Sequence, residues 1–201
     1  MNALATSQAV AGVVPDAGAF VAVVGASGAG KDAVMQWAAT ALADESAVRF
    51  IRRAVTRPAG PGEDHLPHTE AEFDAALAAG AFAAHWPANG LRYGIPLDVD
   101  ELIAAGTTVV ANCSRTALPA LAARFPGLLR VVRVSVSPET RAARLALRGR
   151  ENAVEQAVRL ARTDPAPGFP VDLELGNDGP IAEAGEALAV FLSALRAARS
   201  A

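Results

Sequence analysis

Short apolar runs and segments of helical periodicity alternate along this chain. Phe20–Val24 is wholly apolar, rich in valine, and ends at Gly25. This pattern is typical of a strand buried on both faces of a parallel sheet. The other predicted strands are a stretch near Val48–Val55, then Thr107–Cys113, Leu129–Val136 and Val171–Leu175.

Between these runs, apolar residues recur three and four positions apart. From Lys31 to Leu42 this spacing predicts a helix. Glu70–Ala79 is a second predicted helix, with Thr69 in the N-cap position and Gly80 at its end. The other predicted helices are a segment ending at Arg124, then Pro138–Leu147, Glu151–Arg162 and Ile181–Ala198. Strands that alternate with helices predict an α/β fold with a central parallel sheet flanked by helices.

A length of 201 residues suits one domain with a proper core. Residues 1–18 lack periodicity and contain Pro15, so we predict a flexible leader followed by a single domain over residues 19–201. Residues 50–66 are polar and rich in glycine and proline, which predicts a long loop after the second strand.

One segment carries a motif with a clear chemical meaning. Gly25–Asp32 fits G-x-x-x-x-G-K, with a predicted strand before it and a helix after it. Its glycines allow backbone N–H groups to turn toward phosphate oxygens, and Lys31 can reach the outer phosphates of a nucleotide. A glycine-rich turn without a ligand is the alternative, which the strand–loop–helix context disfavours. The predicted ATP-binding residues are Gly25, Ala26, Ser27, Gly28, Ala29, Gly30, Lys31 and Asp32.

Two residues at the end of this phosphate loop are unusual. Lys31 is the only lysine among 18 basic residues, so the other 17 are arginines. A compact, flexible ammonium group suits phosphate oxygens at that position. Asp32 stands where Ser or Thr normally coordinates Mg²⁺, and a carboxylate is also a hard oxygen ligand. Asp32 is therefore a candidate Mg²⁺ ligand, directly or through water; the alternative is an Asp that only stabilises the helix dipole.

Composition and charge exclude several classes of partner. A net charge of -3 and a pI near 5.6 argue against a general nucleic-acid binder. No apolar run approaches the roughly 20 residues that cross a bilayer, so we expect no membrane partner. The single cysteine, Cys113, suits a reducing cytoplasm, and we expect a buried core thiol. The sequence does not determine the oligomeric state, and a homodimer is compatible with it.

Four motifs, in order along the chain, resemble the guanylate-kinase family. They are the phosphate loop, Thr56-Arg57 followed by Gly62-Glu63-Asp64-His65, Tyr93-Gly94-Ile95-Pro96, and Arg144-Leu145 followed by Arg148-Gly149. The resemblance covers roughly residues 20–195. It implies a P-loop kinase fold with a substrate-binding insertion at about residues 50–100 and a helical lid at about residues 138–162.

Within that family the chain is most similar to the ribose 1,5-bisphosphate phosphokinases of phosphonate degradation. The local features are Gly-Lys-Asp in the phosphate loop, Arg52-Arg53-x-x-Thr-Arg-Pro, Gly-Glu-Asp-His, His85-Trp86, Gly90–Pro96, Asn112-x-Ser114-Arg115 and Arg148–Glu151. The resemblance implies that ATP, with Mg²⁺, phosphorylates ribose 1,5-bisphosphate to give 5-phosphoribosyl 1-diphosphate and ADP.

The chain departs from guanylate kinases at the positions with which those enzymes bind GMP. Gly60 replaces a second arginine, and the guanine-reading glutamate falls at about Ala84. The acidic pair at a strand end falls in Thr107–Leu118, which has no Asp or Glu; Asn112 and Ser114 are the nearest equivalents. A guanine edge needs a carboxylate that accepts its N–H groups, so this loss agrees with a sugar phosphate as acceptor.

The resemblance also assigns roles to several arginines. Arg141, Arg144 and Arg148 are spaced i, i+3, i+7 on one helix face, a spacing that by itself fits a solvated surface. The family pattern places Arg144, Arg148 and Arg159 in the lid, over the transferring phosphoryl group. These three, with Lys31, are the predicted catalytic residues.

The predicted acceptor site comes from the same comparison. Arg57 and Tyr93 match phosphate-contacting positions, while Glu63 and His65 lie in the acceptor loop, where His65 could equally be structural. Asn177 matches a position near the adenine of ATP, with a turn residue in Asn-Asp-Gly as the alternative. Weaker candidates are Arg53, Arg92, Arg141 and Arg150, and His85 and Trp86 are expected to pack the insertion.

Two other functions compete with this reading. One is a guanylate-type nucleoside-monophosphate kinase. The other is a catalytically inactive guanylate-kinase-like interaction module. Such modules typically lose the phosphate loop, whereas Lys31 and all three glycines are present here.

Overall fold

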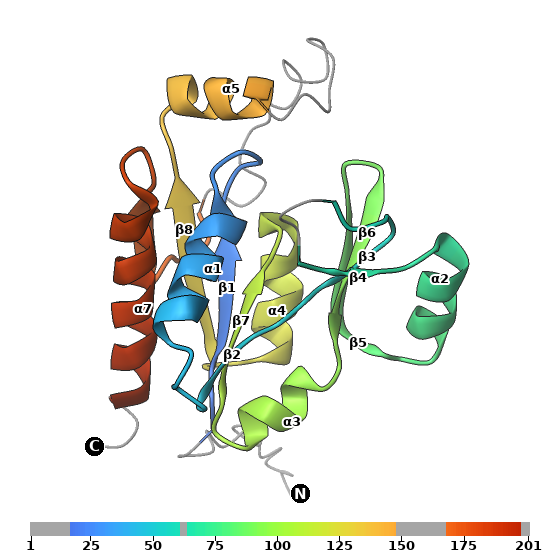
Figure 1. Ribbon diagram of the computed structural model, residues 1–201. Coiled ribbons are helices and arrows are strands. Elements are labelled where there is room, and N and C mark those ends of the chain that lie inside the picture. The colour runs from blue at the N-terminus through green and yellow to red at the C-terminus, as the bar shows by residue number, and fades with distance from the viewer. Residues whose placement is uncertain (1–16, 61–63, 148–167, 198–201) are drawn as a thin grey trace, which may run out of the picture.

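Five parallel strands form a central sheet in the order β2-β7-β1-β8-β9 (Figure 1). The computed structural model describes residues 17–60, 64–147 and 168–197. The strands of the central sheet are β1 (Phe20–Val24), β2 (Val48–Phe50), β7 (Thr108–Asn112), β8 (Leu129–Ser135) and β9 (Leu173–Gly176). In register, Val23 of β1 pairs with Asn112 of β7 and Val132 of β8, so the carboxyl ends of the strands meet at one edge. The predicted α/β fold with a parallel sheet is confirmed.

A second, small sheet has the strand order β4-β3-β6-β5. Its strands are β3 (Ala54–Val55), β4 (Leu66–Pro67), β5 (Phe82–Ala88) and β6 (Leu91–Pro96). The predicted single strand near Val48–Val55 is wrong, because β2 belongs to the central sheet and β3 to the small one. β5 and β6 form an antiparallel hairpin that the sequence analysis missed. Its turn is Asn89-Gly90, both with positive φ, and an Asn-Gly pair between apolar segments is the signal that predicts such a hairpin.

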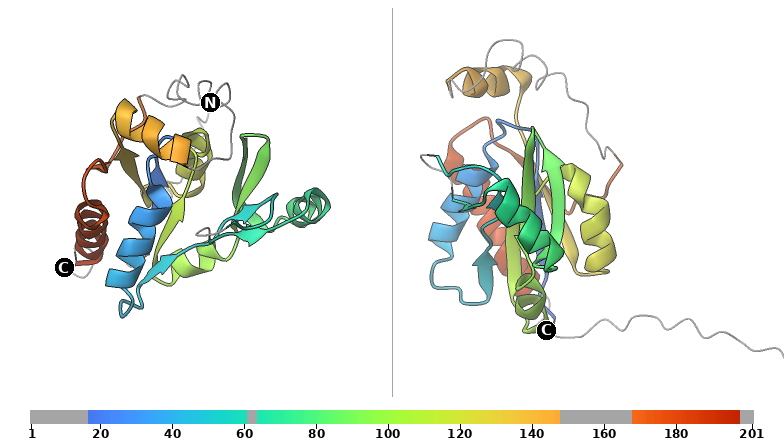
Figure 2. Two further views of the ribbon diagram at one scale, coloured as in Figure 1. Left: turned by 45° about the horizontal axis from the view of Figure 1, so that its top comes forward. Right: turned by 90° about the vertical axis from the view of Figure 1, so that its right-hand side faces the viewer.

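Helices cover both faces of the central sheet (Figure 2). They are α1 (Lys31–Ala41), α2 (Glu70–Ala78), α3 (Val99–Ala104), α4 (Leu118–Arg124) after the 3-10 turn η1 (Arg115–Ala117), α5 (Pro138–Leu147) and α7 (Ile181–Ala197). Alternate residues of β1 face opposite cores. Val21 and Val23 pack with residues of α1 and α7, whereas Phe20 packs with residues of α3, α4 and the small sheet. The small sheet therefore shares a core with one face of the central sheet.

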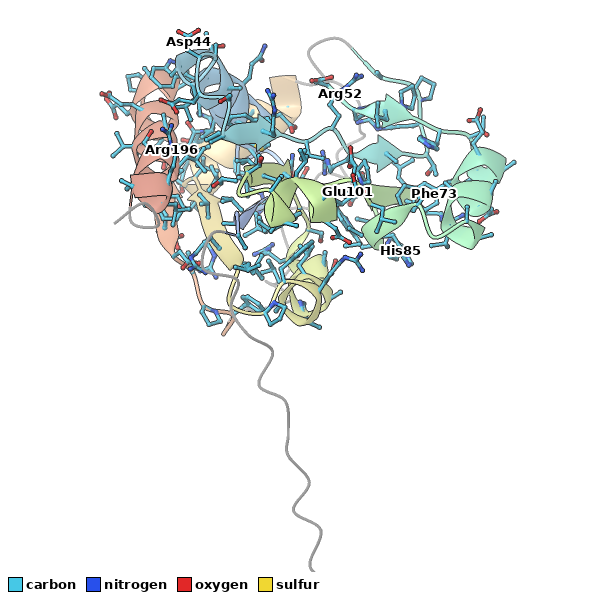
Figure 3. The ribbon with its side chains drawn as sticks, turned by 90° about the horizontal axis from the view of Figure 1, so that it is seen from below. Asp44, Arg52, Phe73, His85, Glu101 and Arg196 are labelled. Atoms are coloured by element: carbon cyan, nitrogen blue, oxygen red, sulfur yellow. The ribbon has the colours of Figure 1, made fainter. Side chains whose placement is uncertain are left out.

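The outer part of the small sheet is closed by α2. Thr69 caps this helix as predicted, because its hydroxyl accepts the Glu72 N–H while the Glu72 carboxylate accepts the Thr69 N–H at 2.7 Å. Phe73 of α2 is fully buried and stacks on Phe82 of β5 at a centroid distance of 4.6 Å. Figure 3 shows Phe73 there, with the exposed His85 on β5 nearby.

The packed domain begins slightly earlier than predicted. Ala17 is buried, and the Gly18 N–H donates to the Ile103 carbonyl at 2.6 Å, so these two residues belong to the domain and not to a leader. Residues 1–16 and the predicted helix Glu151–Arg162 lie outside the described residues. Among the described helices, none has the length and apolar character needed to span a membrane.

Candidate active site

The phosphate loop joins β1 to α1 at the carboxyl edge of the central sheet (Figure 1). Two of its glycines have no room for a side chain. A Cβ on Gly25 would lie 2.3 Å from the carbonyl oxygen of Val134, and one on Gly30 would lie 2.4 Å from Asn177 Nδ2. Gly30 also has a φ of +87°, in the left-handed region that favours glycine. The loop is thus packed against β8 and the segment after β9.

Lys31 opens α1 and places its ammonium group inside the loop. Its Nζ donates to the carbonyl oxygens of Gly25 at 3.0 Å and Ala26 at 3.3 Å. The first N–H groups of a helix have no intrahelical acceptor, and together with the helix dipole they favour an anion at this end. Lys31 and the start of α1 therefore concentrate positive charge at one point of the sheet edge.

Asp32 lies beside the end of the neighbouring strand β7. Its Oδ1 accepts a hydrogen bond from Asn112 Nδ2 at 2.6 Å, and the Arg53 guanidinium is 3.9 Å from the same oxygen. The Asp32 side chain is 59% exposed, whereas Asn112 is buried. Asn112 Oδ1 is buried and finds no donor among the described residues. The site thus offers a carboxylate and an orphaned amide oxygen side by side.

This donor set fits Mg²⁺. Hard oxygen atoms are the ligands that Mg²⁺ prefers, and Mg²⁺ usually completes its shell with water and substrate phosphates. Within residues 17–60, 64–147 and 168–197, no group of three or more His, Cys, Asp or Glu residues could hold a metal by itself. Asp32 and Asn112 would therefore share the ion with a bound nucleotide.

The helix α5 lies across the carboxyl edge of the sheet, above the phosphate loop (Figure 1). Ser137 caps it, since Ser137 Oγ accepts the Thr140 N–H at 3.2 Å. Asp178, which follows β9, accepts the Ser137 N–H at 2.9 Å. Hydrogen bonds from Thr140 and Ser137, aided by the charge of Arg144, lower the pKa of the Asp178 carboxyl. Asp178 was not among the predicted site residues, although it belongs to the Asn-Asp-Gly turn that contains Asn177.

Two arginines of α5 reach the phosphate loop. Arg141 Nε donates to the Ser27 carbonyl at 3.1 Å. Arg144 Nη1 lies 3.4 Å from the position that a Cβ on Gly30 would occupy, and it is buried without an acceptor among the described residues. A buried guanidinium donor without an acceptor is costly, so this arrangement favours an anion between α5 and the loop. The other predicted lid arginines, Arg148 and Arg159, and the weaker candidate Arg150 lie outside the described residues.

Asn177 braces the phosphate loop from the other side. It is 2% exposed, and its Nδ2 donates to the Ala29 carbonyl at 2.8 Å. Its backbone N–H donates to Ser135 O at 2.9 Å, which fixes it at the end of β8. Asn177 Oδ1 is buried and has no donor among the described residues. Asn177 therefore positions the loop and keeps one acceptor available for a ligand.

On the small sheet, Tyr93 is held by aromatic stacking. Its ring stacks on Trp86 at 5.7 Å between centroids and 6° between planes, and Trp86 is buried. Trp86 packs the insertion, as expected, whereas the same prediction for His85 is wrong, because His85 is exposed. Arg92, a weaker candidate, forms ion pairs with Asp74 at 2.5 Å and Glu70 at 3.3 Å. These contacts tie β6 to α2 and point Arg92 away from the phosphate loop.

The segment around His65 is built by hydrogen bonds to backbone atoms. His65 is 4% exposed, and its Nε2 lies 3.2 Å from the Arg57 carbonyl oxygen. Arg52 forms an ion pair with Asp64 at 2.5 Å and donates to the His65 carbonyl at 3.2 Å, where the chain runs from β2 to β3 (Figure 3). Through its contact with the carbonyl oxygen of Arg57, His65 supports the backbone at that residue. Glu63 lies outside the described residues.

Comparisons with known proteins agree with this geometry. No family model matches the chain. It is 54% identical over 171 residues to a protein of Pseudofrankia inefficax named ribose 1,5-bisphosphate phosphokinase, covering 85% of this chain and 88% of that protein. A protein of the same name from Thiobacillus denitrificans is 44% identical over 173 residues, covering 85% and 90%.

The solved structure of guanylate kinase from Anaplasma phagocytophilum superposes with a TM-score of 0.66 at 16% identity, covering 90% of this chain and 87% of that one. This likeness shows the fold, and it confirms the predicted P-loop kinase architecture. With sequence identities of 44% and 54% over most of both chains, the protein belongs to the family of ribose 1,5-bisphosphate phosphokinases, on a guanylate-kinase-like fold.

Proposed function

We propose that this enzyme uses ATP and Mg²⁺ to phosphorylate ribose 1,5-bisphosphate, giving 5-phosphoribosyl 1-diphosphate and ADP. The observation that carries the proposal is that the phosphate loop presents Lys31 and is faced by Arg144 Nη1 of α5, which is buried and has no acceptor among the described residues. This arrangement suits a triphosphate, and the names of the relatives at 44% and 54% identity support the acceptor.

The donor side acts by positioning and charge. Loop N–H groups and Lys31 would hold the β- and γ-phosphates, and Arg144 would face them from α5. Guanidinium groups bind phosphate oxygens in two places, so Arg144 can follow the phosphoryl group as charge is redistributed. Arg148 and Arg159 remain predicted partners in this role. Asn177 holds Ala29, and its Oδ1, which has no donor among the described residues, would meet the base of ATP.

Asp32 and Asn112 would hold Mg²⁺ at the loop. When bound, the ion neutralises negative charge on the phosphate oxygens. Asn112 Oδ1 has no donor among the described residues, so this oxygen is available to a cation. Their mutual hydrogen bond keeps both groups oriented toward the loop.

The chemical step needs no general base. The acceptor is a phosphate monoester that is already anionic near pH 7. One of its oxygens forms a bond to the γ-phosphorus of ATP, while the bond from that phosphorus to the β–γ bridging oxygen breaks. The electron pair of the broken bond leaves with ADP. Catalysis can therefore rest on alignment and on neutralising the charges of the two phosphates.

A guanylate-type kinase is the second candidate, since the fold is shared. The position of the guanine-reading glutamate falls at about Ala84, whose small apolar side chain is buried on β5. The end of β7 carries Asn112 in place of an acid. We therefore expect ADP release to be faster with ribose 1,5-bisphosphate than with GMP in a coupled assay. Faster turnover of GMP would replace the proposed function with the second candidate.

Lys31→Ala tests the donor site. Removing the ammonium group should lower turnover by on the order of 10²- to 10³-fold, as for loss of one electrostatic stabiliser of a transition state. The fold should persist, because Lys31 is partly exposed at the start of α1 and two of its hydrogen bonds go to carbonyl oxygens of the loop itself. Circular dichroism checks the fold, and mass spectrometry of the product identifies the phosphorylated sugar. Near-normal turnover by this variant would contradict the assigned site.

A further inference from the structure

Arg53 lies at the junction of the two sheets. β2 ends at Phe50 in the central sheet, and β3 begins at Ala54 in the small sheet, so the chain crosses between them at Arg53. This is the point where the donor site on the phosphate loop and the candidate acceptor site on the small sheet come together. The sequence analysis ranked Arg53 only as a weaker candidate.

The Arg53 guanidinium contacts both sides of this junction. Its Cζ lies 5.3 Å from the centroid of the Tyr93 ring on β6. Its Nη2 lies 3.9 Å from Asp32 Oδ1 at the end of the phosphate loop. A single side chain therefore spans the distance from the nucleotide side to the acceptor side.

The aromatic contact gives the guanidinium a defined orientation. Tyr93 stacks almost parallel on Trp86, at 6° between planes, and Trp86 is only 4% exposed. The platform under Arg53 is thus fixed by the core of the small sheet. A cation over such a ring is attracted by the π electrons, while the edge of the planar guanidinium keeps its N–H groups available.

The charge of Arg53 is less well matched than that of neighbouring arginines. Arg52 is paired with Asp64 at 2.5 Å, and Arg92 is paired with Asp74 at 2.5 Å. Among the described residues, Arg53 pairs with Asp32 alone, at 3.9 Å, which is too long for a hydrogen bond. The Asp32 oxygen that faces it already accepts the Asn112 amide at 2.6 Å.

The Arg53 side chain is nevertheless largely shielded from water, with 19% of its surface exposed. A guanidinium carries five N–H donors, and among the described residues no acceptor within hydrogen-bond distance of Arg53 is found. A partly buried cation whose N–H groups have no acceptor among the described residues can donate them to an incoming anion. Asp32 is a weak substitute for that anion in the ligand-free protein.

The thiol of Cys113 is influenced by the charges of both Arg53 and Lys31. Cys113 follows β7 and is buried, which raises the pKa of its thiol to about 12. The charges of Arg53 and Lys31 both act on this thiol in the opposite direction. Arg53, on the crossing between the two sheets, and Lys31, in the phosphate loop, therefore both act on the end of β7.

We propose that Arg53 is a substrate-binding residue that holds the attacking phosphate of the acceptor against the γ-phosphate of ATP. This assignment rests on the proposed function. Two phosphates that approach each other repel, and a cation between them reduces that repulsion. The Tyr93 face sets the plane of the fork, so that two N–H groups can bind two oxygens of the acceptor phosphate and leave a third oxygen for attack.

The test compares Arg53→Ala and Arg53→Lys with Arg49→Ala as matched control. Arg49 is exposed on β2 and has no role in the proposed site. For each protein, calorimetry measures the Kd of ribose 1,5-bisphosphate, with and without a non-hydrolysable ATP analogue and Mg²⁺, and the Kd of the analogue. Coupled ADP release gives kcat and KM for the acceptor, and the thermal midpoint monitors the fold.

We expect Arg53→Ala to weaken acceptor binding and to lower kcat/KM by on the order of 10- to 100-fold, as for loss of charge-assisted hydrogen bonds. The Kd of the ATP analogue should change by less than about threefold, which corresponds to less than about 1.4 kcal/mol of binding free energy. The kcat/KM of Arg53→Lys should lie between those of the wild type and Arg53→Ala. Lysine keeps the positive charge but lacks the planar guanidinium group that stacks on Tyr93 and binds two oxygens at once. Added guanidinium ion should restore part of the activity of Arg53→Ala, and Arg49→Ala should behave as the wild type.

Unchanged acceptor affinity and kcat/KM in Arg53→Ala would overturn the assignment. An equal loss of affinity for the ATP analogue would also overturn it, since Arg53 would then serve the nucleotide. If Arg53→Ala does not fold, Arg53→Lys provides the test. Wild-type affinity for the acceptor in Arg53→Lys would then contradict the proposed two-point binding of the acceptor phosphate by the guanidinium group. A wild type that does not phosphorylate ribose 1,5-bisphosphate overturns the proposed function itself, a result separate from any difference among variants.

Discussion

Asn112→Asp would place a second carboxylate against Asp32. In the native protein Asn112 Nδ2 donates to Asp32 Oδ1 at 2.6 Å, and Asn112 is buried at the end of β7. The substitution keeps the size of the side chain, removes the donor and adds a negative charge. It therefore tests whether these two residues lie as close as the structure shows and whether they can share a cation.

The expected loss of stability has two parts. A hydrogen bond to a charged group contributes about 1.5–3 kcal/mol, and this bond is lost. Two unit charges 2.6 Å apart repel by about 6 kcal/mol at an effective dielectric constant of 20. The Asp32 side chain is 59% exposed, so water and side-chain movement relieve most of that repulsion. We expect the free energy of unfolding to fall by about 2–4 kcal/mol at pH 7 without Mg²⁺.

The pH dependence has a definite sign. Beside Asp32, the new carboxyl is harder to ionise in the folded protein than in the unfolded chain. Folding therefore raises the pKa of this carboxyl. A group of this kind is neutral in both states at low pH. The destabilisation is therefore small below about pH 4 and grows as the pH rises through the raised pKa.

Mg²⁺ should reverse the effect. An ion held by the two carboxylates would stabilise the folded state by about 2.7 kcal/mol at a concentration one hundred times its Kd. Urea unfolding at pH 4 and pH 7, with MgCl₂ or with KCl at equal ionic strength, measures these changes. Asn112→Ala is the control, because it loses the hydrogen bond without gaining charge. Wild-type stability of Asn112→Asp at pH 7, or no greater response to Mg²⁺ than the wild type, would refute the reasoning.

Three further predictions concern the fold. Gly185→Ala should lower the free energy of unfolding by about 1–3 kcal/mol, because the new Cβ would lie 2.6 Å from the Trp37 ring. Thr69→Ala removes a helix cap and should cost about 1 kcal/mol in urea unfolding at pH 7. Hydrogen bonds from Thr69 lower the pKa of Glu72, so this stabilisation is present above pH 4.5 and fades as the pH falls through the lowered value. Cys113, whose pKa is about 12, should react with a thiol reagent at pH 8 only after unfolding.

Each of these has a direct control. A Cβ at Gly176 meets nothing within 4 Å, so Gly176→Ala should be far milder than Gly185→Ala, and equal losses would contradict the close packing of α1 and α7. A loss in Thr69→Ala that is as large at pH 3 as at pH 7 would contradict the role of the carboxylate. Rapid labelling of Cys113 in the native protein, followed by absorbance, would contradict its burial.

Local patterns in the sequence were sufficient for most of the central sheet. β1 has the predicted bounds, and α1 ends one residue earlier than predicted. The helices α5 and α7 begin where predicted and run to the last described residue of their segments. Continuous apolar runs and helical spacing reflect burial on sheet faces and helix faces, which are short-range properties. In the small sheet, β3 and β4 have two residues each, too few for any periodicity to predict them. The Asn89-Gly90 turn was the one local signal for its hairpin.

The sequence alone determined the phosphate loop, because its residues are contiguous in the chain. The glycines of the motif also indicate directly where the backbone needs conformations that favour glycine. Tertiary structure alone decided what surrounds that loop. The strand order and the crossing between the two sheets bring together residues that are distant along the chain. These residues are Asp32, Arg53, Tyr93 and Asn112. Periodicity reports which face of an element is buried, but it carries no information about which other element packs there. The partners of each charged side chain, and hence the chemistry of the site, follow from that packing.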